Sequence, residues 1–191
     1  MAEPGTSSRS RALELVKGAA KLPAAVLVDL DYTCWPFWLC HHATGPPFAQ
    51  HHDGFAVVDC SGRPIEMYPE APAVLCALHS LGVPLVACSR SDEPEWCRAV
   101  AELYVLDPST GLRFGGALHE ASVIRPARSK VEHLREIQAA LGVPFQELLF
   151  FDDERRICDE GEAMGVRCVC VAGTGLNLDA LAQGLQAVAR L

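Results

Sequence analysis

The sequence predicts an α/β fold, a doubly wound and mainly parallel sheet flanked by helices. Short apolar runs recur along the chain, and each is typical of a strand that is buried on both faces. Between them lie segments whose apolar residues recur at helical spacing. Half of the 191 residues are hydrophobic, which is enough for one domain with a sizeable core. Because strands alternate with helices, the strands should pair in parallel.

Five apolar runs are predicted to form this sheet. Residues 24–28 make the clearest strand, since they are apolar at every position and charged side chains follow at once. The run that ends at residue 123 is the least regular, because a turn-rich stretch precedes it. The predicted strands are residues 24–28, 83–88, 117–123, 148–151 and 166–171.

Helices are predicted where capping and turn residues bracket an apolar stripe. Ser91 or Asp92 is expected to cap one helix, and Asn177 another, because short polar side chains accept hydrogen bonds from free backbone amides. Gly82 and Gly142 are expected to end two helices. The predicted helices are residues 69–81, 95–104, 129–141, 154–164 and 178–191.

The chain is divided into an N-terminal extension and one domain. Residues 1–22 are expected to form an extension that is disordered or helical, and residues 23–191 a single domain. Residues 34–68 leave the predicted sheet as one excursion, with two extended pieces at 55–59 and 64–68 around a Ser-Gly turn. We expect this excursion to form a small β-hairpin flap over the site, with no large cap domain.

Composition excludes several classes of protein. The net charge of −8 disfavours a nucleic-acid-binding protein, whose surface is usually basic. No apolar run approaches the ~20 residues of a membrane span, so no membrane partner is expected. The N-terminus lacks the apolar core of a secretory signal, which favours the cytoplasm and leaves an organelle transit peptide open. Nine cysteines without a Cys-x-x-Cys motif predict reduced thiols. No metal role is expected for the histidine pairs at 41–42 and 51–52.

Polar side chains with related chemistry follow the predicted strands. Reactive groups in open α/β sheets lie just beyond the carboxyl ends of the strands. A carboxylate there can attack phosphorus and form a covalent phosphoryl intermediate. Cationic and hydroxyl groups can hold the phosphate, whose charge would otherwise repel that carboxylate. These side chains are, in chain order, Asp29, Asp31 and Thr33, then Ser89 and Arg90, then Lys130, then Asp152 and Asp153.

The four carboxylates predict a cation if they converge. Two like charges 4 Å apart repel by about 4 kcal/mol at an effective dielectric constant near 20. A hard divalent ion reverses this sign, and Mg²⁺ prefers a few carboxylates together with water. The sequence therefore predicts a Mg²⁺ site. Without convergence, Asp152-Asp153 is an acidic turn before a helix, and Lys130 is a solvated helix residue.

These motifs resemble those of a known superfamily. Residues 29–33, Ser89, Lys130 and 152–153 are similar to the four motifs of the haloacid dehalogenase-like phosphatases. More closely, the extended first motif at 28–38, Ser89-Arg90 and the segments 142–145 and 150–154 resemble the eukaryotic magnesium-dependent phosphatase family. The resemblance runs from about residue 22 to the C-terminus and implies a Rossmann-like fold with a minimal cap.

The resemblance also implies roles for single residues. Asp29 would be the nucleophile, and Asp31 the general acid and then the general base. The substrate phosphate would contact Ser89 and Arg90, while Lys130 would stabilise both phosphate and nucleophile. Magnesium would be held by Asp29, the backbone carbonyl of Asp31, and Asp152 or Asp153.

The implied activity is hydrolysis of phosphate monoesters, either a phosphorylated small molecule such as fructosamine 6-phosphate or a phosphopeptide of the phosphotyrosine type. We expect a monomer. One alternative is a receiver-like domain that keeps a phosphoryl group on Asp, although receivers carry their acidic pair first and here it comes last. Another is a catalytically weakened paralogue that binds phosphoproteins, because Ile157 stands where family members carry Asn.

Overall fold

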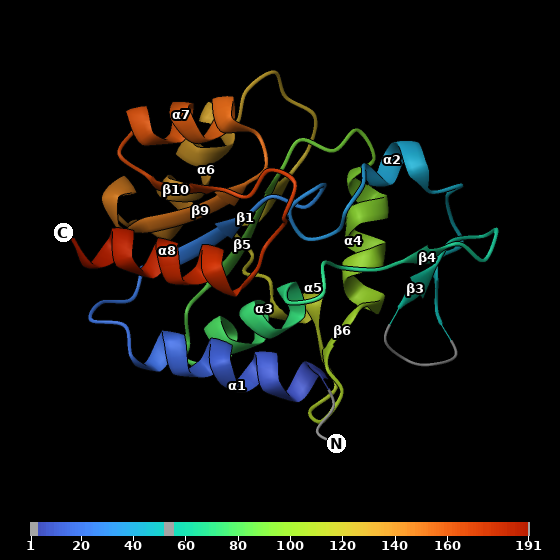
Figure 1. Ribbon diagram of the computed structural model, residues 1–191. Coiled ribbons are helices and arrows are strands. Elements are labelled where there is room, and N and C mark those ends of the chain that lie inside the picture. The colour runs from blue at the N-terminus through green and yellow to red at the C-terminus, as the bar shows by residue number, and fades with distance from the viewer. Residues whose placement is uncertain (1–3, 52–55, 191) are drawn as a thin grey trace.

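A five-stranded parallel sheet forms the centre of the molecule, as the sequence predicts (Figure 1). The computed structural model describes residues 4–51 and 56–190, so residue 55, where the first predicted hairpin strand begins, lies outside the described residues. The strands lie in the order β10-β9-β1-β5-β8. Their bounds are β1 (Ala25–Val28), β5 (Leu85–Ser89), β8 (Val123–Ile124), β9 (Leu148–Asp152) and β10 (Arg167–Cys170).

The register of the sheet aligns the ends of its three central strands. Val28 at the end of β1 pairs with Ala87 of β5 on one side and with Phe151 of β9 on the other. The backbone amide of Asp29 continues this pairing by donating to the Phe151 carbonyl at 2.9 Å. The residues that follow the three strands therefore emerge side by side at one edge of the sheet.

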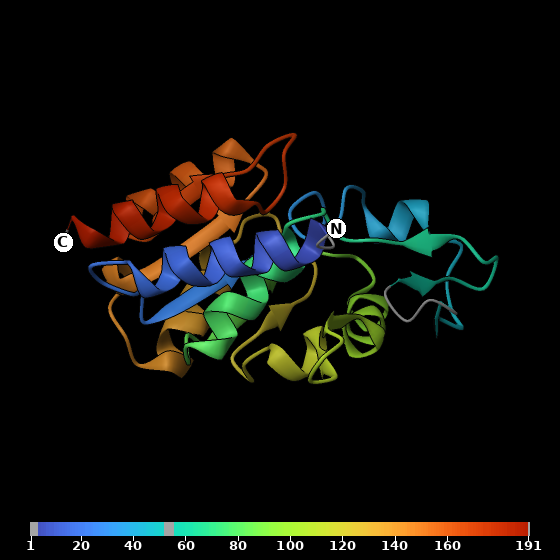
Figure 2. The same cartoon turned by 60° about the horizontal axis from the view of Figure 1, so that its bottom comes forward.

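Helices cover both faces of the sheet, and alternate strand residues face each layer (Figures 1 and 2). Val26 and Val28 pack with one core cluster, while Ala25 and Leu27 pack with the other. The first layer holds α1 (Pro4–Lys17), α3 (Ala71–Ser80) and α8 (Leu178–Ala189), and the second holds α6 (Val131–Leu141) and α7 (Arg155–Ala163). Among the described residues, no helix is long and apolar enough to cross a membrane.

The helix caps confirm one sequence prediction and correct another. The Asn177 side chain accepts from the Ala180 amide at 2.9 Å at the start of α8, as expected. The helix α4 (Pro94–Leu103) does not begin at Ser91 or Asp92. Its N-cap position is Glu93, whose side chain makes no capping bond. The Ser91 hydroxyl accepts from the Glu93 amide, two residues further along and just before the helix.

The predicted strand at 117–123 is wrong except at its end. The chain forms α5 (Phe114–Ala117) and then a turn, and only β8 pairs regularly with β5. The Ser122 hydroxyl donates to the His119 carbonyl at 2.7 Å and accepts from the Ala87 amide at 3.0 Å. The Ser122 side chain thus supplies one bond to β5, beside the backbone bond from the His119 amide to the Leu85 carbonyl at 2.7 Å. Before α5, β6 (Val105–Asp107) and β7 (Leu112–Arg113) form a small antiparallel pair, and a 3-10 turn (Phe145–Glu147) precedes β9.

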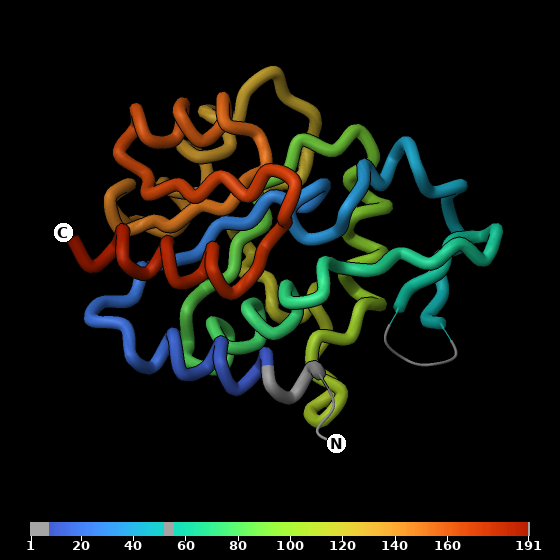
Figure 3. Tube along the Cα trace, viewed as in Figure 1, coloured from blue at the N-terminus to red at the C-terminus, as the bar shows by residue number. Residues whose placement is uncertain are grey.

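The excursion after β1 carries a one-turn helix and a small antiparallel sheet. Figure 3 shows the chain leaving the central sheet and returning to α3. Asp59 is buried in the turn between β3 and β4, where its carboxylate accepts from the amides of Thr44, Ser61 and Arg63. Burial acts to raise the pKa of Asp59, but these hydrogen bonds outweigh it and lower the pKa. The elements are α2 (Leu39–His42), β2 (Ala49–Gln50), β3 (Val57–Val58) and β4 (Pro64–Ile65).

The N-terminal segment forms the helix α1, which packs against α3 and α8. Ala12 and Val16 are buried in the first core cluster. The Arg9 guanidinium binds both carboxylate oxygens of Asp107, at 2.6 and 2.5 Å, and its hydrogen bond holds the pKa of Asp107 well below its usual range. This ion pair fastens α1 to the end of β6.

One buried histidine should make stability depend on pH. His133 on α6 is fully buried, and neither ring nitrogen has a hydrogen-bond partner among the described residues. Burial, together with the positive charges of Arg125, Lys130 and Arg90, lowers its pKa to about 4. Its unfolded pKa is about 6.5, so the unfolded chain binds the proton first, and stability falls as the pH drops from about 6.5 to about 4.

We therefore expect His133→Gln to lose less free energy of unfolding over this pH window than the wild type, by up to about 3 kcal/mol. Urea unfolding at several pH values between 7 and 4 measures the difference. His79→Gln, at the partly exposed end of α3, is the control and should follow the wild-type curve. Parallel curves for His133→Gln and wild type would contradict the prediction.

Candidate active site

The loop after β1 places two carboxylates at the edge of the sheet. Asp29 follows the strand directly, and the backbone then turns sharply, with the Cys34 amide donating to the Leu30 carbonyl at 2.8 Å. Tyr32 adopts a φ of 55°, a left-handed conformation that is uncommon outside glycine. This tight turn brings Asp31 back toward Asp29, and both side chains are buried at the edge of a cavity.

Asp31 is held by two hydrogen bonds from the start of the excursion. Its Oδ1 accepts from the Trp35 indole at 2.6 Å and from the Leu39 backbone amide at 3.1 Å. Trp35 is fully buried and does not line the cavity, so its ring packs in the core. Burial raises the pKa of Asp31, and the Trp35 hydrogen bond only partly offsets this. The environment therefore favours a carboxyl group that can carry a proton.

Lys130 is the buried cation of the site. It occupies the N-cap position of α6, where its Nζ lies 2.5 Å from Asp29 Oδ1 and 2.6 Å from Asp152 Oδ2. The ammonium also lies over the Phe150 ring, 5.5 Å from its centroid. The neighbouring carboxylates raise the pKa of Lys130 although burial opposes them, so the lysine stays charged. It is not the solvated helix residue that the alternative interpretation required.

The carboxylates outnumber this one ammonium, which fits a cation site. Ligand oxygens of Asp29, Asp152 and Asp153 all lie within 4.8 Å of one another. Burial raises the pKa of Asp29 against the pull of Lys130, and burial beside Asp152 raises the pKa of Asp153 to about 6. Burial is the larger cause of both shifts and the charge of Asp152 adds to it; a divalent ion would offset both effects, and an all-oxygen donor set suits Mg²⁺.

Ser89 is the last residue of β5, on the other side of β1 from β9, and Arg90 follows it. The Ser89 hydroxyl is buried and accepts from the Ser91 amide at 3.2 Å. Arg90 pairs with Glu154 at the start of α7 and donates to the Arg128 carbonyl at 3.2 Å. The guanidinium is thereby held at the rim of the cavity, between the segments that follow β5 and β9.

Seven of the eight polar side chains predicted from the sequence meet in one place, while Thr33 is buried and does not line the cavity. They surround a cavity of about 290 Å³ at the carboxyl edge of the sheet. Asp152 lies behind the wall, fully buried, with its second oxygen accepting from the Glu154 amide at 2.8 Å. The lining residues are Asp29, Asp31, Trp38, Cys40, His41, Ser89, Arg90, Ser91, Asp92, Ala127, Lys130, Asp153 and Glu154.

The excursion contributes to this wall through α2 and the residue before it. Trp38 lines the cavity although 52% of it is exposed, and its ring meets Tyr32 edge-on at 5.8 Å. Cys40 and His41 line the cavity beside it. The small sheet β2-β3-β4 lies farther out, beyond α2 (Figure 1).

Two partners in the site were not predicted from the sequence. The sequence assigns no hydrogen-bonding role to Trp35, four residues after Asp31, yet its indole donates to that carboxylate. Glu154 was placed in the helix that follows the acidic pair, and its ion pair with Arg90 spans 64 residues, so no local pattern signals it. Ile157 packs in the apolar cluster between the sheet and α6. The side chain at the position where the family resemblance implies Asn is therefore part of the core.

Comparisons with known proteins agree with this geometry. A family model described as acid phosphatase matches residues 21–190. Magnesium-dependent phosphatase 1 of Homo sapiens is 41% identical over 171 residues, which cover 90% of each chain. A HAD-like hydrolase superfamily protein of Schizosaccharomyces pombe is 31% identical over 147 residues, covering 76% of this chain and 84% of that protein.

A solved structure shares the fold. It is the N-terminal part of a Bacteroides fragilis protein, containing a phosphatase domain complexed with Mg. The two superpose with a TM-score of 0.54 at 17% sequence identity, covering 97% of this chain and 44% of the other.

Proposed function

Because the chain belongs to the acid phosphatase family of haloacid dehalogenase-like proteins, we propose that it is a magnesium-dependent phosphatase acting through a phosphoaspartate on Asp29. The observation that carries the proposal is the meeting of Asp29, Asp31, Lys130 and the pair 152–153 around one cavity. These groups come from two separate strand ends, those of β1 and β9, and from the start of α6, and acidic turns with unrelated roles have no reason to converge there.

Asp29 is the proposed nucleophile. Its carboxylate attacks phosphorus, and the ester oxygen of the substrate leaves as the acyl phosphate forms. Lys130 touches Oδ1 of Asp29, so the ammonium fixes the orientation of the carboxylate and counters the charge of the approaching phosphate. Ser89 and Arg90 are proposed to hold the remaining phosphate oxygens from the opposite side of the cavity.

Asp31 is the proposed acid and base. It protonates the leaving oxygen and then removes a proton from the water that opens the acyl phosphate. Its raised pKa suits the first step, and the Trp35 and Leu39 donors both bind Oδ1, which leaves Oδ2 for the transferred proton. The same feature argues against the receiver-like alternative, because a positioned base would hydrolyse the phosphoaspartate that a receiver keeps.

Asp29, Asp152 and Asp153 are proposed to hold Mg²⁺, with the Asp31 carbonyl as a further ligand implied by the family resemblance. When bound, the ion would neutralise phosphoryl oxygens in the transition state. The Asp152 carboxylate lies between Lys130 and the Glu154 amide, so its orientation is fixed by the protein itself.

The exposed ring of Trp38 at the cavity favours substrates with an aromatic leaving group, such as phosphotyrosine or an aryl phosphate. Its edge-on contact with Tyr32 and its tilted contact with the His41 ring at 5.3 Å orient the indole, and its exposed part can pack against a substrate ring.

Phosphate release from an aryl phosphate tests the proposal. We expect turnover in excess Mg²⁺, loss of turnover on chelation and recovery when Mg²⁺ is restored, because the charge of the carboxylates then has no counter-ion. Turnover that persists in the chelator would argue for a different mechanism. Accumulation of a stable phosphoprotein without released phosphate would support the receiver-like alternative.

A further inference from the structure

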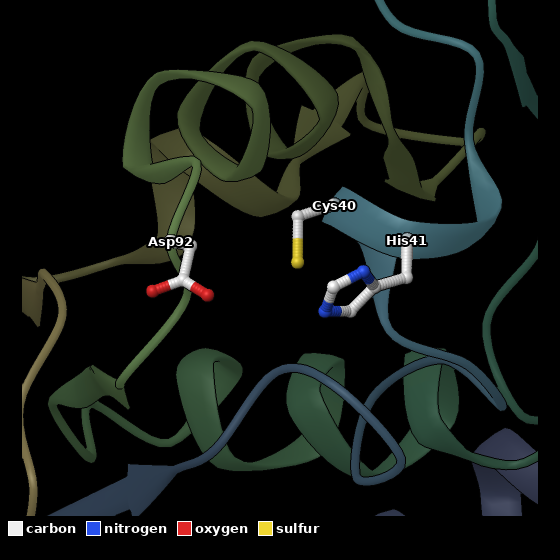
Figure 4. A group of neighbouring side chains, drawn as sticks. All are labelled: Cys40, His41 and Asp92. Carbon is white, nitrogen blue, oxygen red and sulfur yellow. The ribbon is translucent and has the colours of Figure 1, made fainter.

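A second group of possible metal ligands lies at the mouth of the cavity. Cys40 and His41 are neighbours on α2, and Asp92 lies in the loop between β5 and α4. The thiol sulfur, an imidazole nitrogen and a carboxylate oxygen all lie within 4.8 Å of one another. Figure 4 shows the three side chains pointing into a common space between α2 and that loop.

The protein fixes the place of both halves of this group. The Leu39 amide at the start of α2 is bonded to Asp31, and the Leu39 side chain is fully buried. On the other side, the Ser91 amide is bonded to Ser89 at the end of β5. The two segments are therefore anchored independently of the three ligands, and the ligands need to move little to close on an ion.

The ligand chemistry differs from that of the carboxylate site. Mg²⁺ binds oxygen donors, whereas a thiolate and an imidazole together suit Zn²⁺. Zinc bonds of about 2.0–2.3 Å place tetrahedral ligand atoms about 3.3–3.8 Å apart, so these atoms would close by at most about 1.5 Å. Three protein ligands leave a fourth position open. All three residues line the cavity, so this position faces the place where a phosphate would enter.

We propose that Cys40, His41 and Asp92 form a Zn²⁺ site that is separate from the magnesium site. When zinc fills this second site, it closes the cavity to substrate. On binding, the Cys40 S–H bond breaks, a Zn–S bond forms and the proton passes to solvent, so no oxidant or reductant is required. The ion also joins α2 of the excursion to the loop that carries Asp92. Closure of the cavity rests on the proposed phosphatase function, whereas binding of zinc does not.

This site lies outside what the sequence analysis predicted. The sequence predicts no metal role for the paired histidines, because residue 53 is the one acid close to them in the chain at a spacing that suits a metal ligand. The carboxylate that completes the set belongs to Asp92, about fifty residues along the chain, and reaches His41 only through the fold.

Cobalt binding tests the site itself, in the presence of excess Mg²⁺ so that the carboxylate site is occupied. We expect Co²⁺ to give the near-ultraviolet charge-transfer absorption of a cobalt–thiolate bond, and Zn²⁺ to displace it at one equivalent. Cys40→Ser should abolish this absorption and weaken Zn²⁺ binding at least tenfold, and Asp92→Asn should weaken it with the thiolate absorption retained.

Two matched variants serve as controls. Cys60→Ser removes an exposed thiol elsewhere, and His42→Gln removes the neighbouring imidazole, whose Nδ1 bonds the Trp38 carbonyl instead. Both should bind cobalt and zinc as the wild type does. A cobalt spectrum without a thiolate band, or equal zinc affinity in wild type and Cys40→Ser, overturns the site.

Phosphatase assays test the closure. With Mg²⁺ in excess, zinc should inhibit the wild type and the two control variants at the concentration that fills the site, and should inhibit Cys40→Ser at least tenfold less effectively. Equal inhibition of Cys40→Ser places the zinc effect at the carboxylate site and overturns the closure. If no variant hydrolyses phosphate at all, the proposed function fails, while the cobalt spectra still decide the zinc site.

Discussion

Replacing Asp29 with asparagine is expected to lower kcat for an aryl phosphate by about 10⁴-fold or more, since a nucleophile's loss typically costs this much. The amide has the shape of the carboxylate but cannot attack phosphorus. The variant should fold at least as stably as the wild type, because burial raises the pKa of Asp29 and Lys130 keeps its contact with Asp152. Steady-state assays in excess Mg²⁺ and thermal unfolding measure the two effects.

Rapid quenching adds a direct test of the intermediate. The wild type should yield a phosphoprotein that hydroxylamine cleaves, as expected of an acyl phosphate, and Asp29→Asn should yield none. Asp159→Asn removes an exposed carboxylate from α7 and should leave both kcat and the phosphoprotein unchanged. Turnover by Asp29→Asn within tenfold of the wild-type rate would exclude Asp29 as the nucleophile.

Replacing Lys130 with methionine is expected to reduce stability by about 3–5 kcal/mol in the absence of a divalent ion. Removing one partner of a buried ion pair leaves the other charges uncompensated, and here Asp29 and Asp152 both lose their ammonium. Mg²⁺ should restore part of this loss, since it supplies positive charge to the same carboxylates. The rate should also fall by about 10²–10³-fold, because the cation that faces the phosphate is gone.

Urea unfolding with and without Mg²⁺ measures the effect on stability. Lys21→Met is the matched control, because Lys21 is exposed before β1, and it should change stability by less than about 0.5 kcal/mol. The assignment of Lys130 as the buried counter-charge fails if Lys130→Met is as stable as Lys21→Met and Mg²⁺ stabilises the two equally.

The parts of the site that follow strands were predictable from sequence. Asp29, Ser89 and Asp152 each come at or directly after the end of a strand, and strands in a parallel sheet end at one edge. The short apolar runs located these ends to within about a residue. The sequence could therefore place carboxylates and hydroxyl together before any coordinates were known.

Residues between the strands were less predictable, because their structure depends on distant partners. The run at 117–123 was predicted as a strand, yet it pairs regularly with β5 only at its end, and the Ser122 side chain makes the bond to the Ala87 amide. The excursion was predicted as a hairpin flap over the site, but the part of it that lines the cavity is α2 with the residue before it. A hydrogen bond from the Leu39 amide to Asp31 holds α2 there. Glu154 and Asp92 reach their partners only through the tertiary fold.

The contact between Arg90 and Glu154 has a consequence for ligand selection. Because the Arg90 guanidinium is already paired with the Glu154 carboxylate, exchanging that partner for chloride or for another carboxylate would lower the free energy little. A phosphate dianion carries more charge on three strong acceptor oxygens, so it can displace Glu154 where weaker anions cannot. When inorganic phosphate departs, the glutamate is next to the freed arginine and can take it back. If Arg90 holds the substrate phosphate as proposed, the pair would select for dianions and would help inorganic phosphate to leave.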